Sequence, residues 1–424
     1  MSYDLSKVAR ALTESQQFAE PGMNLSDPKT NLRVISSQDH GSITIRDNGC
    51  ILFNEAVHEL LKDEDLAELV GQEAIENEVK KLVIAKYFSD NRTIDREEIK
   101  TSIIKRVKED IGDWIVFHPI INLDMKGAFE IGAIRFLPLE MALAESTRCV
   151  MSYAFPGEAD DQESQRGLGL RCIHMAIGNG NCYARVVVRA HKQQCINHSK
   201  IMVEYIINAV RAFSSMFYNY SEKRIFGLPE EVSSNRSWTI SIGTPSGSFN
   251  TTNELHGFER PFVFDKDVYA RLCKVINISK LVAPLSRVRK TWNSLESATL
   301  SAAISLGRSV VAPRLDQAFL GCAIAIERLL IPDGSESTVE RFSDRLALLI
   351  GNNKDQRMQI AKSARRLYDL RSRIVHAAYT SIERSDHLEL ERLAIYALLA
   401  VINDETVYVL HEAFCLQLNA KKYE

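Results

Sequence analysis

Apolar residues recur at helical spacing through much of the first part of the chain, between about residues 55 and 111. Asp95 precedes Glu98 by three residues, which is the spacing of a capping box, so a helix is expected to begin there. Closer to the start, "SITIRDNGCILF" is interpreted as a hairpin. Helices therefore dominate this part, with one short stretch of expected sheet.

From Trp114 onward the pattern becomes that of strands. "WIVFHPIINLDM" and "FEIGAIRFLPL" predict strands, and residues 171–190 predict a hairpin because Asn179-Gly180 supplies the positive φ angles of a tight turn. Residues 198–220 return to helical spacing, and residues 237–249 predict a strand with a turn rich in Gly, Pro and Ser. The first 260 or so residues are therefore expected to mix α and β structure.

Strand signals nearly vanish after residue 262. Segments with helical spacing follow one another, separated by Pro, Gly and Asn: residues 265–282, 288–307, 314–331, 337–351, 355–379 and 387–418. Ser337 and Glu340 predict a capping box at the fourth of them. The expected fold class is α+β: a mixed region at 1–262, followed by an all-α bundle at 263–424.

Composition and charge narrow the class of protein. The 424 residues, 45% hydrophobic and 25% charged, are typical of a globular protein of two or three domains. No apolar run is long enough to span a membrane, and the N-terminus lacks the pattern of a secretory signal, so a cytosolic location is expected. The eight cysteines form no CxxC pair and are expected to be reduced thiols.

The formal charge of −3 argues against a surface that is basic throughout, so any contact with nucleic acid must be local. The most basic stretch runs from Lys354 to Arg373, where seven basic residues stand against two acidic ones, which gives 7 − 2 = +5. Within it, the residues expected to bind a nucleic acid are Lys362, Arg365, Arg366 and Arg373.

The same stretch places an arginine where a helix would keep an apolar residue. Arg371 falls in the middle of an apolar stripe, and His376 lies about 140° away around the helix. The members of the stripe are Ile360, Ala364, Leu367, Ile374 and Ala378. Because an arginine stays charged, a position facing a core is costly unless a carboxylate or a phosphate meets it.

Three interpretations of Arg371 follow from the residues. In the first, it pairs with a buried carboxylate such as Glu327, or its stem crosses apolar surface to reach solvent. In the second, it lies in a cleft between two protomers. In the third, that cleft binds a phosphodiester, with Arg371 as the anion clamp and His376 as the proton carrier.

The stretch "LYDLRSRIVHAA", together with the upstream "AFLGCAIAIERLLI", resembles the HEPN superfamily of nucleotide-binding domains, most closely its Apea-like branch. The resemblance covers roughly residues 285–424. It implies a dimeric, metal-independent RNase of the kind found in bacterial anti-phage and abortive-infection proteins. It also implies that Arg371 and His376 are the catalytic pair and that Glu327 is the acidic residue of the site.

RNA cleavage suits these residue types because RNA carries its own nucleophile, the 2′-OH. Cleavage needs a base, an acid and positive charge on the phosphate, and no metal or cofactor is expected. Histidine, with an unperturbed pKa of about 6.5, can take either proton role. An arginine fork matches two phosphate oxygens. Because one motif supplies one proton carrier, the chemistry favours a homodimer.

The sequence therefore predicts a cytosolic endoribonuclease whose residues 263–424 are the effector. Residues 1–262 are expected to sense a phage-derived or host trigger, and RNA is the expected partner. The alternative is a catalytically silent HEPN module that acts as an oligomeric scaffold or binds nucleic acid. Cysteine and histidine residues, which could bind zinc, cluster between Cys172 and His198. Their spacing matches no zinc finger, so we interpret them as ordinary residues of a sheet rather than as a zinc site.

Overall fold

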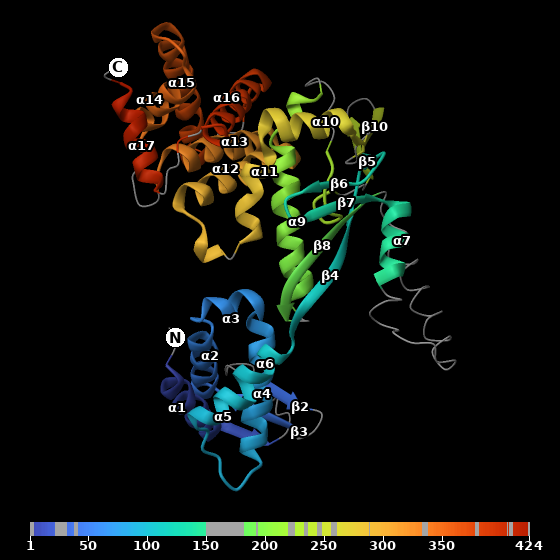
Figure 1. The fold of residues 1–424 in the computed structure, drawn as a ribbon, viewed down its shortest axis with the longest axis vertical. Helices are drawn as coiled ribbons and strands as arrows, with labels where there is room; N and C mark the ends of the chain where they lie inside the picture. The colour runs from blue at the N-terminus through green and yellow to red at the C-terminus, as the bar shows by residue number, and fades with distance from the viewer. Residues whose placement is uncertain are drawn as a thin grey trace. The chain divides into compact units, whose positions relative to one another are not determined.

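The structure is a computed structural model, and it forms two compact units (Figure 1). Unit 1 joins Met1–Val116 to Val187–Ile201, and unit 2 joins Phe117–Val186 to Met202–Glu424. The residues described are 4–21, 32–37, 41–149, 182–191, 194–218, 225–232, 236–243, 248–255, 261–287, 289–332, 338–377, 381–404, 406 and 410–422.

Unit 1 packs helices against a small antiparallel sheet. Among the described residues the strand order is β1-β3-β2, with β1 at Ala19–Pro21, β2 at Leu32–Ser37 and β3 at Gly41–Arg46. The helical segments are α1 (Leu5–Ser15), η1 (Gln16–Phe18), α2 (Asn48–Leu60), α3 (Glu64–Leu69), α4 (Gln72–Tyr87), α5 (Arg96–Ile99), η2 (Lys100–Lys105) and α6 (Arg106–Glu109). Their apolar faces share one core, which includes Leu12, Ile43, Ile45, Phe53 and Val79.

The expected capping box is confirmed, because Asp95 accepts the Glu98 N–H while Glu98 accepts the Asp95 N–H. The hairpin expected at "SITIRDNGCILF" is wrong: β3 ends at Arg46 and helix α2 begins at Asn48. Gly49 serves close packing here, since a Cβ on it would lie 2.5 Å from the Ile45 side chain. Glycine at this position thus permits the close approach of α2 to β3.

A four-stranded sheet follows, in the order β4-β8-β7-β6 among the described residues. Its strands are β4 (Ile111–Ile120), β6 (Phe129–Ile131), β7 (Ile134–Pro138) and β8 (Cys182–His191), with β6, β7 and β8 paired antiparallel. Helices α7 (Leu139–Cys149) and α9 (Cys195–Arg211) follow β7 and β8, and α9 leads to the 3-10 turn η5 (Ser214–Met216). The predicted turn at Asn179-Gly180 lies outside the described residues.

Smaller strand pairs complete the mixed region. Strand β5 (Leu123–Met125) pairs in parallel with β11 (Phe262–Phe264), and β9 (Arg236–Gly243) pairs antiparallel with β10 (Ser248–Leu255). The predicted strand at 237–249 thus corresponds to the β9-β10 pair, while the turn predicted between them lies outside the described residues. Phe264 ends the last described strand, close to the expected boundary, while the status of residues 263–424 as a separate domain stays a prediction.

Beyond Phe264 every described element is helical, which confirms the expected fold class (Figure 1). The elements are α10 (Lys266–Arg271), η6 (Leu272–Ile276), α11 (Ile278–Val282), η7 (Ala283–Ser286), η8 (Arg289–Thr291), α12 (Ser294–Val311), α13 (Leu315–Leu330), α14 (Val339–Ile350), α15 (Lys354–Ala377), α16 (Arg384–Ile402) and α17 (His411–Ala420). No helix in the described part of the chain is long and apolar enough to cross a membrane.

Three details of the predicted helices need correction. Asn277 takes a left-handed conformation, with φ 58°, and divides the first predicted helix. The last predicted helix, 387–418, is two helices, because α16 ends at Ile402 and α17 begins at His411. The N-cap of the fourth is Thr338, whose hydroxyl accepts the Arg341 N–H at 3.2 Å, and Ser337 lies outside the described residues.

The helical region of unit 2 packs directly on α9. At Gly307 of α12 the two helices approach so closely that a Cβ would lie 2.1 Å from the carbonyl oxygen of Asn208. Nearby, Arg308 Nη2 lies 3.9 Å from Glu204 Oε2. Only glycine fits at this crossing, because the atoms it meets belong to the backbone and cannot swing aside.

We expect Gly307→Ala to lower the free energy of unfolding by about 1–3 kcal/mol, because overpacking at a backbone contact outweighs the better helix propensity of alanine. Urea denaturation followed by circular dichroism measures this change. Gly127→Ala is the matched control, since a Cβ there has no atom within 4 Å. Equal midpoints for the two variants would contradict the close crossing.

Candidate functional site on helix α15

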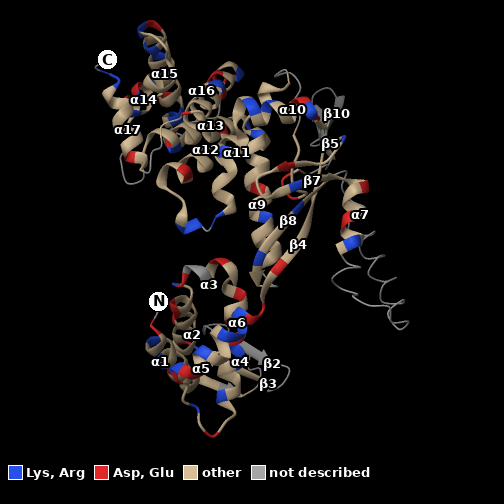
Figure 2. Cartoon of the chain, viewed as in Figure 1, with Lys and Arg blue, Asp and Glu red and all other residues tan. Residues whose placement is uncertain are grey.

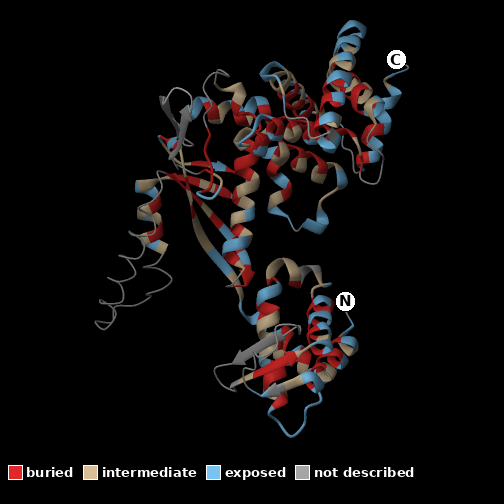
Figure 3. Cartoon of the chain, turned by 180° about the vertical axis from the view of Figure 1, so that it is seen from behind, coloured by how far each residue is buried: buried red, intermediate tan, exposed pale blue. Residues whose placement is uncertain are grey.

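Helix α15 carries the apolar stripe that the sequence predicts. It packs along α14 and also contacts α13 and α16. Ala364 and Leu367 are fully buried and Ile374 is nearly so, while Ile360 is half-buried. Ala378 lies outside the described residues. Figure 3 shows that exposed positions gather on the other side of the helix.

Arg371 lies within this stripe and is largely enclosed, with 23% of its side chain exposed. Its Nη2 donates a hydrogen bond to Oε2 of Glu327, on α13, at 3.2 Å. Its guanidinium carbon also lies 5.7 Å from the centre of the Tyr368 ring, which is within the range of a cation–π contact. The sequence named Glu327 as the carboxylate for Arg371, and the two side chains do meet.

The Nε–H donor of Arg371 has an unusual environment. Its Nε is enclosed and has no hydrogen-bond partner among the described residues. An enclosed donor without a partner costs about 1–3 kcal/mol, so this pose needs support from the groups around it. Glu327 supplies a charge-assisted hydrogen bond and Tyr368 supplies a ring, and both restrain the guanidinium.

His376 lies in the last turn of α15 and is exposed. Within the described residues it makes no hydrogen bond or ion pair, in contrast to Arg371. A separation of five positions places the two side chains about 140° apart around the helix. A single chain therefore holds the arginine against Glu327 and leaves the histidine in solvent. Both adjoin Val375, a half-exposed apolar residue.

Arg365 and Arg366, which were expected to bind RNA, contact carboxylates of neighbouring helices. Figure 2 shows the basic and acidic positions on these helices. Arg365 lies 3.2 Å from Asp344, on α14. Arg366 contacts Asp386 and lies 2.5 Å from Glu389, both on α16. The hydrogen bond with Asp386 is the main cause that raises the pKa of Arg366 above its ordinary value. Lys362 and Arg373 are exposed, as are Arg365 and Arg366.

Sequence reasoning missed the aromatic part of the site. The ring of Tyr368 lies 5.0 Å, centre to centre, from that of Phe342 on α14, and Tyr368 is in turn beside Arg371. The spacing of three residues between Tyr368 and Arg371 was a usable signal, because such residues are neighbours on a helix. Phe342 had no such signal, since it is brought in by packing between two helices.

The cysteine and histidine cluster gives no metal centre among the described residues, where no three His, Cys, Asp or Glu side chains are placed to hold an ion. Cys172 and His174 lie outside those residues. Cys182 is buried with its Sγ 2.9 Å from the Met125 sulfur, and burial raises the pKa of Cys182 to about 12. The seven described cysteines are free thiols.

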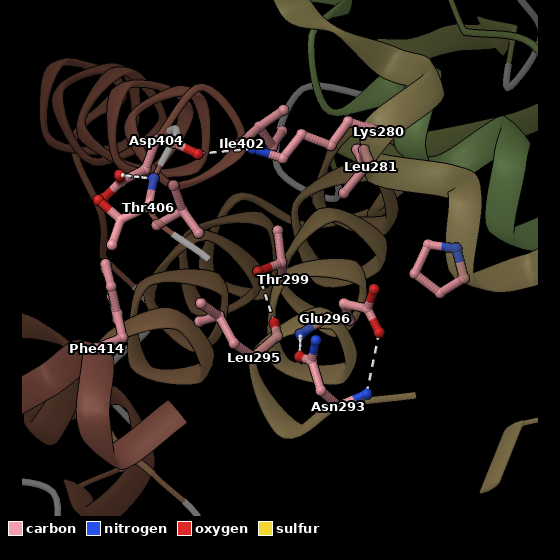
Figure 4. A pocket seen from close by; sticks show the side chains of 12 residues that line it. Lys280, Leu281, Asn293, Leu295, Glu296, Thr299, Ile402, Asp404, Thr406 and Phe414 are labelled. Carbon is pink, nitrogen blue, oxygen red and sulfur yellow. Dashed lines mark hydrogen bonds between the residues drawn. The ribbon is translucent and has the colours of Figure 1, made fainter. Parts of the chain in front are cut away.

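A cavity of about 180 Å³ lies elsewhere in the helical region, between α11, α12 and the segment after α16 (Figure 4). Its polar lining is largely bonded within the protein. Lys280 Nζ donates to the carbonyl oxygen of Asp404 at 2.7 Å, and Thr299 donates to the carbonyl oxygen of Leu295 at 2.7 Å. The lining includes neither Arg371 nor His376, so the cavity is a separate feature.

Comparisons of the chain with known protein families, with curated proteins and with solved structures found no match. The similarity to the HEPN superfamily therefore stays a prediction from the motif.

We expect a double-mutant cycle of Arg371→Met and Glu327→Gln to give a coupling energy of about 1–2 kcal/mol, because this pair is mostly withdrawn from solvent. The Arg365→Met and Asp344→Asn cycle is the matched control, and an exposed pair of this kind should give about 0.2–1 kcal/mol. Urea denaturation of all the variants measures both. A coupling for Arg371 and Glu327 no larger than the control would contradict the enclosed ion pair.

Proposed function

We propose that the chain is a metal-independent endoribonuclease of the HEPN type that acts in bacterial defence against phage, in the cytosol. The observation that carries this proposal is the pairing on α15: an enclosed arginine restrained by Glu327 and Tyr368, followed one turn later by an exposed histidine. Arg371 is the proposed phosphate-binding residue, and His376 is the proposed acid or base.

Arg371 suits the phosphate role because its geometry is restrained before any substrate arrives. Glu327 takes one donor of Nη2, and the other donors of the two terminal nitrogens, Nη1 and Nη2, remain for phosphate oxygens. A donor already in place stabilises charge that gathers on the phosphate without reorganising during the reaction. Glu327 is thus proposed to orient Arg371 while offsetting part of its charge.

His376 suits proton transfer because it is exposed and unengaged within the described residues. One histidine can serve as the base for the 2′-OH or as the acid for the leaving 5′-oxygen, so a second copy of the chain must supply the other group. The proposed active form is therefore a homodimer, or a larger homo-oligomer.

RNA is the proposed substrate, and Lys362 and Arg373, both exposed on α15, are among its proposed contacts. Arg365 and Arg366 would reach phosphates only if they left Asp344, Asp386 and Glu389. Residues 1–262 are proposed to hold the nuclease at a low basal rate, which is still measurable with the purified protein, until a phage-derived or host trigger arrives. A nuclease that attacks host RNA needs such control.

The alternative is a catalytically silent module that acts as an oligomeric scaffold or binds nucleic acid. The observation that favours it is the same ion pair, since Arg371 has a carboxylate partner within its own chain and needs no phosphate to meet its charge. The two functions differ in what they require of His376, which only the nuclease needs.

We expect purified protein to cut RNA in EDTA and to leave fragments that end in 2′,3′-cyclic phosphate, because the 2′-OH is the nucleophile. His376→Ala should lower the cleavage rate about 10²- to 10⁴-fold without changing the melting temperature, as loss of an acid or base does. Single-stranded DNA of the same sequence should stay intact, since it lacks the 2′-OH. Gel electrophoresis with end-group analysis measures the products.

His58→Ala is the control, because His58 is an exposed histidine on α2 in the other unit. It should cleave like the wild type. Cleavage at the wild-type rate by His376→Ala would exclude the proposed nuclease site. A large fall in melting temperature for Arg371→Ala, together with intact RNA in every sample, would favour the silent module.

A further inference from the structure

Tyr368 of α15 contacts both the ring of Phe342 on α14 and the guanidinium of Arg371. It is nearly buried, and its ring packs at 5.0 Å and 53° against that of Phe342, which is fully buried on α14. One turn further along α15, the Arg371 guanidinium carbon lies 5.7 Å from the Tyr368 ring centre. Phe342 thus fixes the ring, and the ring borders the guanidinium.

The pose of Arg371 depends on such a support. Its Nε is enclosed without a partner among the described residues, so rotamers that carried it into solvent would regain a hydrogen bond to water. The single bond to Glu327 restrains one nitrogen and leaves the plane of the guanidinium free to rotate about it. A second restraint from an aromatic face fixes that plane.

We propose that Tyr368, braced by Phe342, is a positioning residue that holds the guanidinium plane of Arg371 in the orientation that receives the phosphodiester. This inference rests on the proposed ribonuclease function for its consequence in catalysis. The orientation itself is a property of the folded chain and can be tested without RNA.

Positioning and binding make different predictions for kinetics. An arginine that stays charged but moves still attracts RNA, so KM changes little. It no longer meets the charge that gathers on the phosphate in the transition state, so kcat falls. The proposed restraint comes from the ring, which packs on Phe342 and lies beside the guanidinium.

The experiment compares Tyr368→Leu, which removes the ring, with Tyr368→Phe, which keeps it. Tyr368→Leu should lower kcat about tenfold with KM within about twofold, a change that corresponds to about 1.4 kcal/mol. Tyr368→Phe should restore the wild-type rate. Phe319→Leu is the control for general loss of packing, because Phe319 is a fully buried aromatic of α13. It should lower the melting temperature and leave kcat unchanged.

The readout without RNA is the Nε–H signal of Arg371 in an NMR spectrum of protein labelled with ¹⁵N-arginine, assigned by its loss in Arg371→Lys. The signal should exchange slowly with solvent in the wild type, in Tyr368→Phe and in Phe319→Leu, and at least tenfold faster in Tyr368→Leu. Unchanged exchange in Tyr368→Leu would overturn the inference, whether or not the protein cuts RNA. Faster exchange in a protein that does not cut RNA would uphold the positioning and refute the nuclease.

Discussion

An enclosed guanidinium must have its charge and its donors met, and this requirement organises the second unit of the chain. Arg211, at the end of α9, is fully buried. Its Nε donates to the carbonyl oxygen of Phe226 at 2.6 Å, its Nη1 to Asn208 at 3.0 Å and its Nη2 to Glu231 at 2.8 Å. One side chain thereby fastens the segment around Phe226 to the helix on which α12 packs.

Arg371 differs from Arg211 because only some of its donors have partners. Arg211 has a partner at each of its three nitrogens, as suits a structural arginine. Arg371 has Glu327 at one nitrogen, a ring beside it and an enclosed Nε without a partner among the described residues. Buried polar groups left unsatisfied are rare in folded proteins and often mark functional positions. Arg371 is thus bonded less completely than Arg211.

The sequence predicted what depends on local pattern. The helices at 314–331 and 355–379 follow from apolar periodicity, and the enclosed position of Arg371 follows from its place in that stripe. Glu327 could be named because an acidic residue near an apolar helix face is conspicuous. Asp344, Asp386 and Glu389, the partners of Arg365 and Arg366, were not predictable, because only the packing of α14 and α16 against α15 brings them together. For the same reason three arginines of the basic run, Arg365, Arg366 and Arg371, are paired with carboxylates in the structure.

The crossing at Gly307 has a consequence for how the chain can be divided. The backbone of α12 rests on that of α9, and Tyr269 at the start of the helical region donates to the carbonyl oxygen of Glu130 in the sheet. Cleaving the chain near residue 262 and removing α9 would expose the surface of α12 around Gly307, which packs on the backbone of Asn208. A displacement of α9 would be transmitted to α12 directly, because backbone atoms of the two helices are in contact.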